Sequence, residues 1–327
     1  MKTLNNIPVL VTGGAGFIGS NLIEALLHEG ADVLCMDNFA TGHHKNIESF
    51  LKNPHFELLE ADIRNPESCL KACKNRQIVF HQAALGSVPR SIKDPATSNE
   101  VNISGFLHML IAARESGVKR FIYAASSSTY GDSESLPKVE DKIGKPLSPY
   151  AITKYVNELY ADVFARTYGF ESIGLRYFNV FGRRQDPQGA YAAVIPKWVM
   201  QLMKHEPIVI NGKGEYSRDF TYIDNVVQAN LKAALTEDLT AVNQVYNVAY
   251  GDRTTLNDLS HWLREILATY DPAIASVSID HGPYRQGDIP HSLASIEKAR
   301  TKIGYDPQYN LKQGLVEACK WYWDNLK

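Results

Sequence analysis

The stretch IPVLVTGGAGFIGS, residues 7–20, decides the fold of this chain. It contains a short apolar run, residues 7–11, that is followed by a glycine-rich turn. The next segment, residues 21–29, is amphipathic and predicts a helix. A strand, a glycine turn and a helix in this order create a place where a pyrophosphate can sit on a helix N-terminus. Gly13, Gly16 and Gly19 lack the β-carbons that would keep phosphates away from the backbone amides. The segment therefore predicts a dinucleotide-binding turn.

Two acidic residues follow the next two predicted strands. Residues 31–36 read as a strand that leads to Asp37, about twenty residues beyond the glycines. A carboxylate in this place can bind the adenosine ribose hydroxyls and would repel a 2′-phosphate, so NAD is favoured over NADP. Residues 56–60 form a third predicted strand, and Asp62 just beyond it is expected beside the adenine ring.

Strand-like runs alternate with helical periodicity along most of the chain. This pattern predicts an α/β fold with a doubly wound, mostly parallel sheet of the Rossmann type, covered by helices on both faces. Beyond Tyr177 the pattern breaks into Pro-, Gly- and Arg-rich stretches, which indicates a smaller, discontinuous α/β substrate domain. We expect a nucleotide domain of residues 1–177 plus about 222–249, and a substrate domain of about 178–221 plus 250–327.

Composition and charge narrow the class of protein. The 327 residues are 44% hydrophobic, enough for a sizeable core, and the net charge of −2 gives no footprint for nucleic acid. No apolar run is long enough to span a bilayer or placed like a signal peptide, so we expect a cytoplasmic protein. The four cysteines lack zinc-ligand spacing, no metal is expected, and Cys69 and Cys73 are interpreted as buried thiols on a helix. His81, after a predicted strand, is interpreted as a core histidine.

The segment SPYAITKYVNELYADVFA, residues 148–165, carries the candidate chemistry. Tyr150 and Lys154 stand four apart and therefore lie on one face of the predicted helix. The pKa of free tyrosine is near 10. For Tyr150 to act as a base at neutral pH, this pKa must fall by about three units, which corresponds to about 4 kcal/mol of differential charge stabilisation. A neighbouring ammonium and a cationic nicotinamide can supply that stabilisation.

The glycine pattern, Ser126 at the end of a predicted strand and Tyr150-x-x-x-Lys154 together resemble the extended short-chain dehydrogenase/reductase superfamily, which acts on nucleotide-linked sugars. The similarity runs essentially from end to end. It is strongest to the UDP-N-acetylhexosamine 4-epimerases of bacterial surface-polysaccharide pathways, in the segments HQAALGSVPRS, YAASSSTYGD, LRYFNVFGRRQ, SRDFTYIDN and RQGDIPHS. This resemblance implies an NAD-dependent isomerase that passes through a 4-keto sugar. It also implies a homodimer formed through a helix-helix interface.

The resemblance assigns roles to individual residues. Tyr150 would take the proton of the sugar 4-hydroxyl with help from Ser126, and Lys154 would hold the nicotinamide ribose. The expected cofactor contacts are Gly13, Gly16, Phe17, Ile18, Gly19, Asp37, Asn38, Asp62, Ile63, Ala83, Tyr150, Lys154 and Tyr177. The expected substrate contacts are Gly86, Ser87, Ser126, Ser127, Asn179, Ala193, Val194, Arg218, Arg253, Arg285, Asp288 and Ser292.

Each predicted substrate residue is assigned a role by the chemistry or the size of its side chain. By resemblance, Arg218 and Arg285 bind the phosphates, which suits the fork geometry of guanidinium groups. Asp288 matches the uridine-ribose partner and Asn179 a diphosphate donor, whereas Arg253 can equally form a surface ion pair. Gly86, Ser87 and Ala193 match small wall positions. Ser292 matches the small residue that admits a 2-acetamido group, where related enzymes for plain hexoses have a large aromatic residue.

The serines after Ser126 indicate the type of reaction. Related dehydratases carry Asp-Glu where this chain has Ser127 and Ser128, and related decarboxylases keep a glutamate at Ser128. Without these carboxylates, the reaction that remains is removal of the hydride from C4 of the sugar and its return to the same carbon, which is epimerisation. The alternatives are a 4-epimerase for UDP-N-acetylhexosaminuronic acid or for UDP-Glc/UDP-Gal, a 4-ketosugar reductase or dehydratase, and a cofactor-sensing protein without activity.

Overall fold

The computed structural model describes residues 3–189, 192–284 and 289–326. Within these ranges the centre of the molecule is a seven-stranded sheet in the order β11-β6-β5-β4-β1-β2-β3, with parallel neighbours throughout. Its strands are β1 (Pro8–Thr12), β2 (Asp32–Asp37), β3 (Phe56–Glu60), β4 (Ile78–His81), β5 (Arg120–Ser126), β6 (Ser172–Tyr177) and β11 (Gln244–Val248). The strand order reverses between β1 and β4, where open α/β sheets bind ligands at the carboxyl ends. The expected parallel sheet is thereby confirmed.

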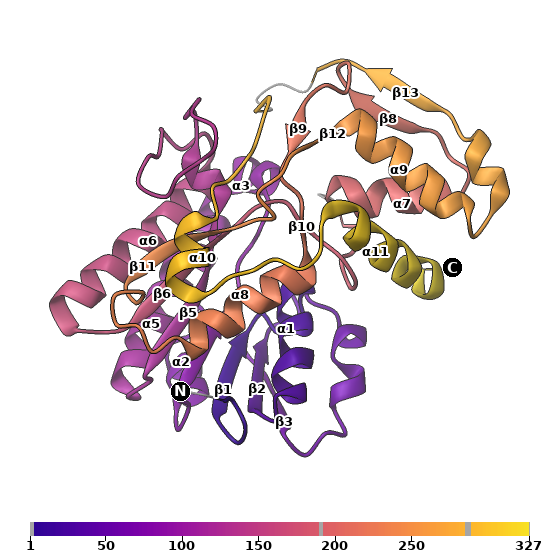
Figure 1. The fold of residues 1–327 in the computed structure, drawn as a ribbon. Coiled ribbons are helices and arrows are strands. Elements are labelled where there is room, and N and C mark those ends of the chain that lie inside the picture. The colour runs from indigo at the N-terminus through magenta and orange to yellow at the C-terminus, as the bar shows by residue number, and fades with distance from the viewer. Residues whose placement is uncertain (1–2, 190–191, 285–288, 327) are drawn as a thin grey trace.

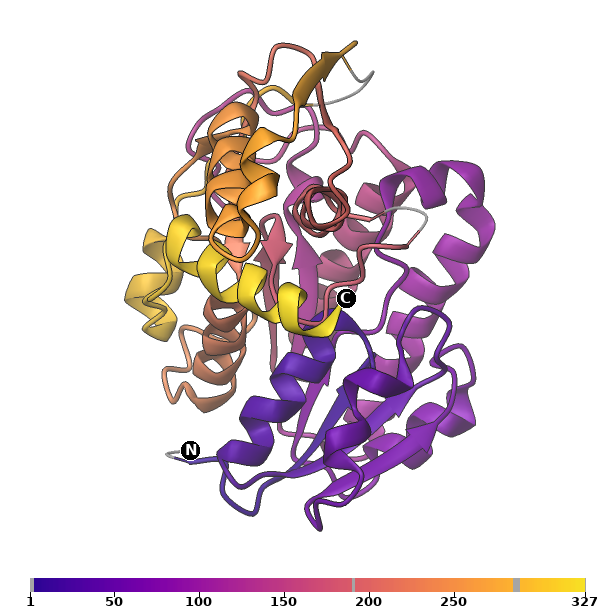
Figure 2. The same cartoon turned by 90° about the vertical axis from the view of Figure 1, so that its right-hand side faces the viewer.

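Helices cover both faces of this sheet (Figures 1 and 2). On one face α1 and α8 pack together, and on the other α5 packs against α2 and α6. These helices are α1 (Phe17–His28), α2 (Pro66–Cys73), α5 (Phe106–Glu115), α6 (Pro149–Tyr168) and α8 (Ile223–Leu235). Each face has its own buried core, with Leu22 and Val226 in one and Phe106 and Cys69 in the other. Cys69 and Cys73 are buried on α2, as predicted.

Short helical turns connect several strands to these helices. They are η1 (His44–Asn46), η2 (Glu48–Phe50), α3 (Val88–Lys93), α4 (Pro95–Asn99), η3 (Glu100–Gly105) and η4 (Ser127–Tyr130). The η3 segment is a π-helical turn that leads directly into α5. Wider turns of this kind often occur next to functional sites.

A second, smaller lobe lies at the carboxyl end of the sheet (Figure 1). It contains α7 (Val194–Met203), α9 (Leu256–Ala268), η5 (Pro272–Ser276), α11 (Leu311–Asn325) and the parallel pair β8 (Ile208–Asn211) and β13 (Ile279–Gly282). The helix α10 (Glu297–Ile303) instead packs against β11 and α8 of the main sheet domain. Two short pairs join the lobes: β7 (Val180–Phe181) with β10 (Thr221–Tyr222), and β9 (Ser217–Arg218) with β12 (Thr254–Thr255). The stretch of about 222–249, which we expected to return to the nucleotide domain, forms α8 and β11, and β11 pairs with β6 in the main sheet.

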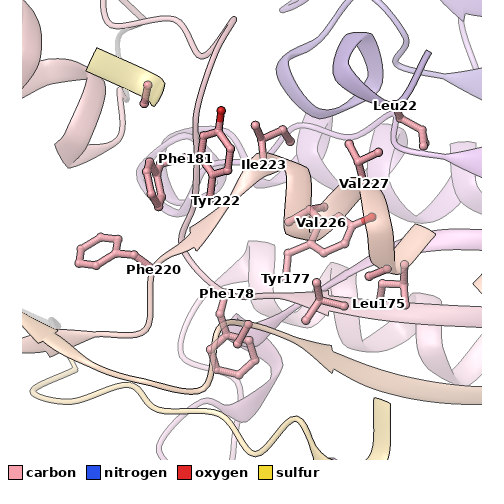
Figure 3. Packing of buried hydrophobic residues seen from close by; sticks show 14 of the residues in the cluster. Leu22, Leu175, Tyr177, Phe178, Phe181, Phe220, Tyr222, Ile223, Val226 and Val227 are labelled. Carbon is pink, nitrogen blue, oxygen red and sulfur yellow. The ribbon is translucent and has the colours of Figure 1, made fainter. Parts of the chain in front are cut away.

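Buried aromatic side chains fill the junction of the two lobes (Figure 3). Phe178, Phe181, Phe220 and Tyr222 are at most 5% exposed and come from the chain around β7 and β10. Burial of rings of this size contributes about 1.5–3 kcal/mol each. The junction therefore fixes the segment from β9 to β10 relative to the main sheet.

The first helix differs from the prediction in its starting point. It was expected over residues 21–29, but α1 already begins at Phe17, with Gly16 as the extended residue before it. The glycine turn is short because the N–H of Gly16 returns to the carbonyl of Gly13 at 3.1 Å. Phe17 and Ile18 therefore belong to the first helical turn. As a result, the helix N-terminus lies at the glycine residues themselves.

No helix in the described ranges combines the length and apolar character needed to cross a membrane.

Candidate functional site

The glycine turn forms a cradle that side chains would fill. Gly13 has a φ of 67°, and a β-carbon there would lie 2.8 Å from the backbone of Ala83. A β-carbon on Gly19 would lie 2.1 Å from the carbonyl oxygen of Gly13. Both contacts are closer than real atoms permit, so these two positions require glycine. The bare backbone at the start of α1 is thus available to a pyrophosphate.

A cleft of about 380 Å³ opens above this turn at the switch point of the sheet. The ten predicted cofactor residues outside α6 and β6 line it, and they are Gly13, Gly16, Phe17, Ile18, Gly19, Asp37, Asn38, Asp62, Ile63 and Ala83. Gly86, a predicted sugar-wall residue, lies at the same cleft. The chain therefore brings residues from four strand ends into one elongated site. These residues fit an NAD molecule.

Asp37 is held rigidly at one side of the cleft. Its two carboxylate oxygens accept hydrogen bonds from the backbone N–H groups of Ala15, at 2.9 Å, and Phe39, at 2.8 Å. Burial raises its pKa, and these backbone hydrogen bonds oppose that effect. The remaining lone pairs of the carboxylate can accept bonds from ribose hydroxyls.

Asp62 lies farther along the cleft and is bound by two neighbours. The guanidinium of Arg64 donates to it at 2.8 Å, and the amide of Asn38 does so at 2.8 Å. The hydrogen bond with Arg64 is the main reason that its pKa falls to about 2. Asp62 is therefore ionised at neutral pH where the adenine is expected.

Helix α6 presents the candidate catalytic pair. Ser148 caps the helix by accepting the N–H of Ala151 at 3.1 Å, and Pro149 occupies its first position. Tyr150 is therefore in the first turn and half-buried. The buried Lys154 lies one turn later, where its ammonium donates to the carbonyl of Ala124 at 2.8 Å.

The electrostatics of this pair are set by burial. Burial raises the pKa of Tyr150, while its interaction with the Ser126 hydroxyl lowers it. Burial also lowers the pKa of Lys154 to about 8, against the attraction of Glu158. Glu158 in turn forms a buried two-pronged ion pair with Arg176, at 2.9 and 2.7 Å. In the structure the pKa of Tyr150 is thus set by burial and by the Ser126 hydroxyl, and its activation by Lys154 and a cationic nicotinamide stays a prediction.

Ser126 ends β5 beside this pair and is only 9% exposed. Its hydroxyl oxygen accepts hydrogen bonds from the N–H of Ser128, at 3.2 Å, and from the Ser128 hydroxyl, at 2.9 Å. The Ser126 proton thus remains available for a bond toward Tyr150 or a substrate oxygen. Ser127 and Ser128 both lie in η4, which holds no carboxylate.

Tyr177 lies opposite Ser126 in the register of β5 and β6. Its hydroxyl contacts the side chains of Gln82, at 3.2 Å, and Asn230, at 2.9 Å. The hydroxyl is therefore occupied by a buried polar network, which the sequence did not predict. His81 is buried as well, with its ring 2.9 Å from the Thr12 hydroxyl, as the core interpretation predicts.

The predicted substrate residues lie on separate segments. Gly86 and Ser87 precede α3, and Ala193 and Val194 begin α7. Arg218 is on β9, where Thr254 lies opposite it, so the neighbouring Arg253 is brought near. The N–H of Ser292 donates to the carbonyl of Ser217 at 3.0 Å, next to Arg218. Asn179 follows β6 with a φ of 35°, and Arg285 and Asp288 lie outside the described residues.

Other residues that support the site were not predicted. Asn102, in η3, accepts the N–H of Leu85 at 2.8 Å and donates to the hydroxyl of Thr153 in α6 at 3.1 Å. It thereby joins the loop before Gly86 to the helix of Tyr150. A buried asparagine in a helical segment gives no local signal of such a contact.

The fold and site define a dinucleotide-dependent enzyme with a Tyr-Lys pair at the end of a Rossmann-type sheet. Over residues 9–249 the sequence matches the NAD dependent epimerase/dehydratase family, and the chain belongs to this family. It is therefore an enzyme that uses NAD.

Several solved structures are similar over almost the whole chain. UDP-glucose 4-epimerase of Thermotoga maritima, solved with UDP-glucose, is 36% identical over 98% of this chain and 100% of its own, with a TM-score of 0.89. UDP-N-acetylglucosamine 4-epimerase of Methanobrevibacter ruminantium, solved with UDP-N-acetylmuramic acid, is also 36% identical, covers 99% of both chains and has a TM-score of 0.89. UDP-glucuronic acid 4-epimerase of Bacillus cereus, solved with UDP-glucuronic acid and NAD, is 30% identical over 97% and 99%, with a TM-score of 0.88.

Proposed function

We propose that this UDP-sugar 4-epimerase interconverts UDP-N-acetylglucosamine and UDP-N-acetylgalactosamine. The observation that supports the reaction is the hydrogen bond between Tyr150 and Ser126 at the end of β5, where Lys154 donates to Ala124, beside a turn, η4, that holds serines in place of carboxylates. A small side chain at Ser292, beside the segment of Arg218, supports the N-acetylated sugar.

In this proposal each residue has one chemical task. The Tyr150 phenolate accepts the proton of the sugar 4-hydroxyl, and the Ser126 hydroxyl hydrogen-bonds the same oxygen. The Lys154 ammonium favours the phenolate and holds the nicotinamide ribose. NAD, when bound, supplies the acceptor that takes the C4 hydride and gives it back. The sugar must turn over between these two events, so the UDP group has to carry most of the binding.

The UDP group is assigned to the smaller lobe. We propose that residues of about 178–221 and 250–327 form the UDP-sugar-binding part, with Arg218 and Arg285 on the phosphates, and the remainder the NAD-binding part. In the same proposal Asn179 donates to the diphosphate, Asp288 accepts from the uridine ribose, and Arg253 reinforces the charge.

We also propose that two copies associate through α6. Ile152, Leu159 and Val163 are 50%, 47% and 43% exposed, and their spacing places them on one face of the helix. An unpartnered apolar stripe of this kind fits the same stripe on a second copy. A Leu159→Glu variant should sediment as a monomer while the wild type sediments as a dimer.

The decisive experiment incubates the protein with UDP-N-acetylglucosamine and, separately, with UDP-N-acetylgalactosamine, without added cofactor. Both should approach the same mixture. Parallel reactions with UDP-glucose and UDP-glucuronic acid test the other sugars. Faster conversion of either of these sugars would show that it, and not the N-acetylated sugar, is the preferred substrate. Net consumption of NADH would indicate a reductase, and accumulation of a 4-keto product would indicate a dehydratase.

A further inference from the structure

Several chain segments meet around one buried carboxylate, that of Asp219, which lies between β9 and β10 and is 0% exposed. One of its oxygens accepts hydrogen bonds from the backbone N–H groups of Tyr250, at 3.2 Å, and Gly251, at 3.3 Å. The other oxygen accepts from Ala294, at 3.1 Å, and Gly251, at 3.2 Å. The backbone carbonyl of Asp219 accepts the side-chain amide of Asn179 at 2.9 Å.

Each of these segments carries a residue that the proposed function assigns to the UDP-sugar. Arg218 directly precedes Asp219, and Arg253 follows the two N–H donors of the second segment. Ser292 stands two residues before the third N–H donor. Asn179 is itself a donor in the network. The Asp219 carboxylate thus connects the segments of Arg218, Arg253 and Ser292, and its backbone carbonyl adds Asn179.

We propose that Asp219 is a positioning residue for UDP-sugar binding, whose carboxylate holds the segments of Arg218, Arg253 and Ser292 in the arrangement that binds the UDP group, while its backbone carbonyl holds Asn179. This inference rests on the proposed function. A carboxylate suits the task because both of its oxygens only accept, so it can join several N–H donors at once. A fully satisfied buried network of this type favours one arrangement of the segments that it joins.

The charge of Asp219 adds a functional signature. Burial raises its pKa to about 7, the backbone hydrogen bonds lower it, and the nearby Asp252 raises it further. The ionised form accepts all of the N–H groups, so UDP binding should favour ionisation. Because the pKa is raised in the free protein, the affinity for UDP should fall as the pH drops below about 7. Among the described residues, the charged and titratable side chains on the surrounding segments include Arg218, Tyr250, Asp252, Arg253, His291 and Tyr305.

Calorimetry with UDP alone, at pH values below and above neutrality, tests the proposal. Asp219→Asn keeps the size of the side chain but turns one acceptor oxygen into a donor that opposes an N–H group. Above neutral pH its affinity for UDP should be at least about tenfold below that of the wild type, which corresponds to about 1.4 kcal/mol. The variant should also lose the part of the pH dependence that comes from Asp219, while the part that comes from the ionisation of UDP persists in both proteins. In turnover assays the KM for the UDP-sugar should rise more than kcat falls.

Two matched variants separate Asp219 from its neighbours. His291→Gln replaces the neighbouring histidine, whose ring nitrogen lies 2.9 Å from the Ser217 hydroxyl, and the pH dependence should persist in this variant. Arg218→Ala should weaken UDP binding and also retain the pH dependence. A loss of that dependence in His291→Gln would assign it to the histidine and overturn the proposal.

A measurement on the wild type covers the case in which Asp219→Asn does not fold. Binding of UDP near neutral pH should release about half a proton more than the protonated fraction of free UDP at that pH can supply, seen by calorimetry in two buffers of different ionisation enthalpy. No such excess release in the wild type, or an unchanged UDP affinity in Asp219→Asn, would overturn the proposal. Because UDP is the probe, a protein that shows these effects but converts no N-acetylated sugar refutes only the proposed substrate.

Discussion

The backbone N–H of Tyr150 donates a hydrogen bond to the hydroxyl oxygen of Ser91, 3.0 Å away and 59 residues earlier in the chain. Ser91 is fully buried on α3, where its own hydroxyl donates to the carbonyl of Val88 at 2.8 Å. The first N–H groups of a helix have no partner within the helix. Ser91 supplies that partner for the candidate catalytic residue, so α3 fixes the first turn of α6.

Replacing Ser91 by Ala should therefore impair turnover as well as stability. The variant leaves the Tyr150 N–H without an acceptor, which should lower the free energy of unfolding by about 1–2 kcal/mol. We expect kcat to fall while the affinity for UDP stays unchanged, because the bond from Tyr150 to Ser91 joins α6 to α3 and involves none of the residues assigned to the UDP group. Ser98→Ala is the matched control, since it removes another buried hydroxyl that donates to a nearby carbonyl, that of Asp94. Equal kcat values in the two variants would contradict the role of Ser91.

The Tyr150→Phe variant separates chemistry from binding. It deletes the phenol that accepts the proton but leaves the ring, so kcat should fall by about 10²–10⁴-fold and UDP should bind as before. Tyr155→Phe, on the same helix, controls for the loss of a hydroxyl. Single-turnover assays and UDP calorimetry measure the two effects. Wild-type kcat in Tyr150→Phe would show that another group moves the proton.

Lys154 should reduce stability in exchange for activity. Burial lowers the pKa of Lys154 to about 8. At neutral pH the folded protein therefore holds the Lys154 ammonium in its charged form, which burial disfavours. Lys154→Met should abolish turnover yet raise the free energy of unfolding at pH 7, by about 1–3 kcal/mol. Because the folded pKa lies below the unfolded one, this gain should shrink as the pH rises above about 8. Urea unfolding at several pH values measures it, and a loss of stability at pH 7 would show that the bond from Lys154 to Ala124 outweighs the burial cost.

Asp37 should determine which dinucleotide accompanies the protein. NAD should purify with the wild type, and denaturation followed by assay of the supernatant should recover it. Asp37→Asn keeps the acceptor for one of the two backbone N–H groups but removes the charge that repels a 2′-phosphate. We expect weaker binding of NADH and stronger binding of NADPH in this variant. Recovery of NADP from the wild type would refute the assignment.

Some residues of the candidate site could be located from their neighbours in the sequence alone. The glycine turn and Asp37 line the cleft at the carboxyl ends of β1 and β2, and Tyr150 and Lys154 stand in successive turns of α6, as their spacing predicts. Ser91, Asn102 and Asp219 were missed because their partners stand tens of residues away and only the folded chain brings them together. The start of α1 was placed too late because Phe17 and Ile18 were counted with the glycine turn.

The contacts of Ser292 make its replacement the sharpest test of the proposed substrate. Its N–H is bound to the carbonyl of Ser217, and the next residue but one is held by Asp219, so the backbone at this position cannot move aside easily. In Ser292→Tyr a ring should occupy the space of the acetamido group, and a packed site absorbs such a volume only with strain of about 1–3 kcal/mol. UDP-galactose lacks the acetamide and should be affected less.

The measurement is kcat/KM for UDP-N-acetylgalactosamine and UDP-galactose in the wild type, Ser292→Tyr and the small control Ser292→Thr. The ratio of the two substrates should shift toward UDP-galactose by about tenfold or more in Ser292→Tyr, as the strain energy implies, and little in Ser292→Thr. A ratio that is the same in all three proteins would mean that Ser292 does not border the 2-substituent. The substrate would then be a UDP-hexose whose 2-substituent is recognised by other residues, with Gly86, Ser87 and Ala193 the next positions to replace.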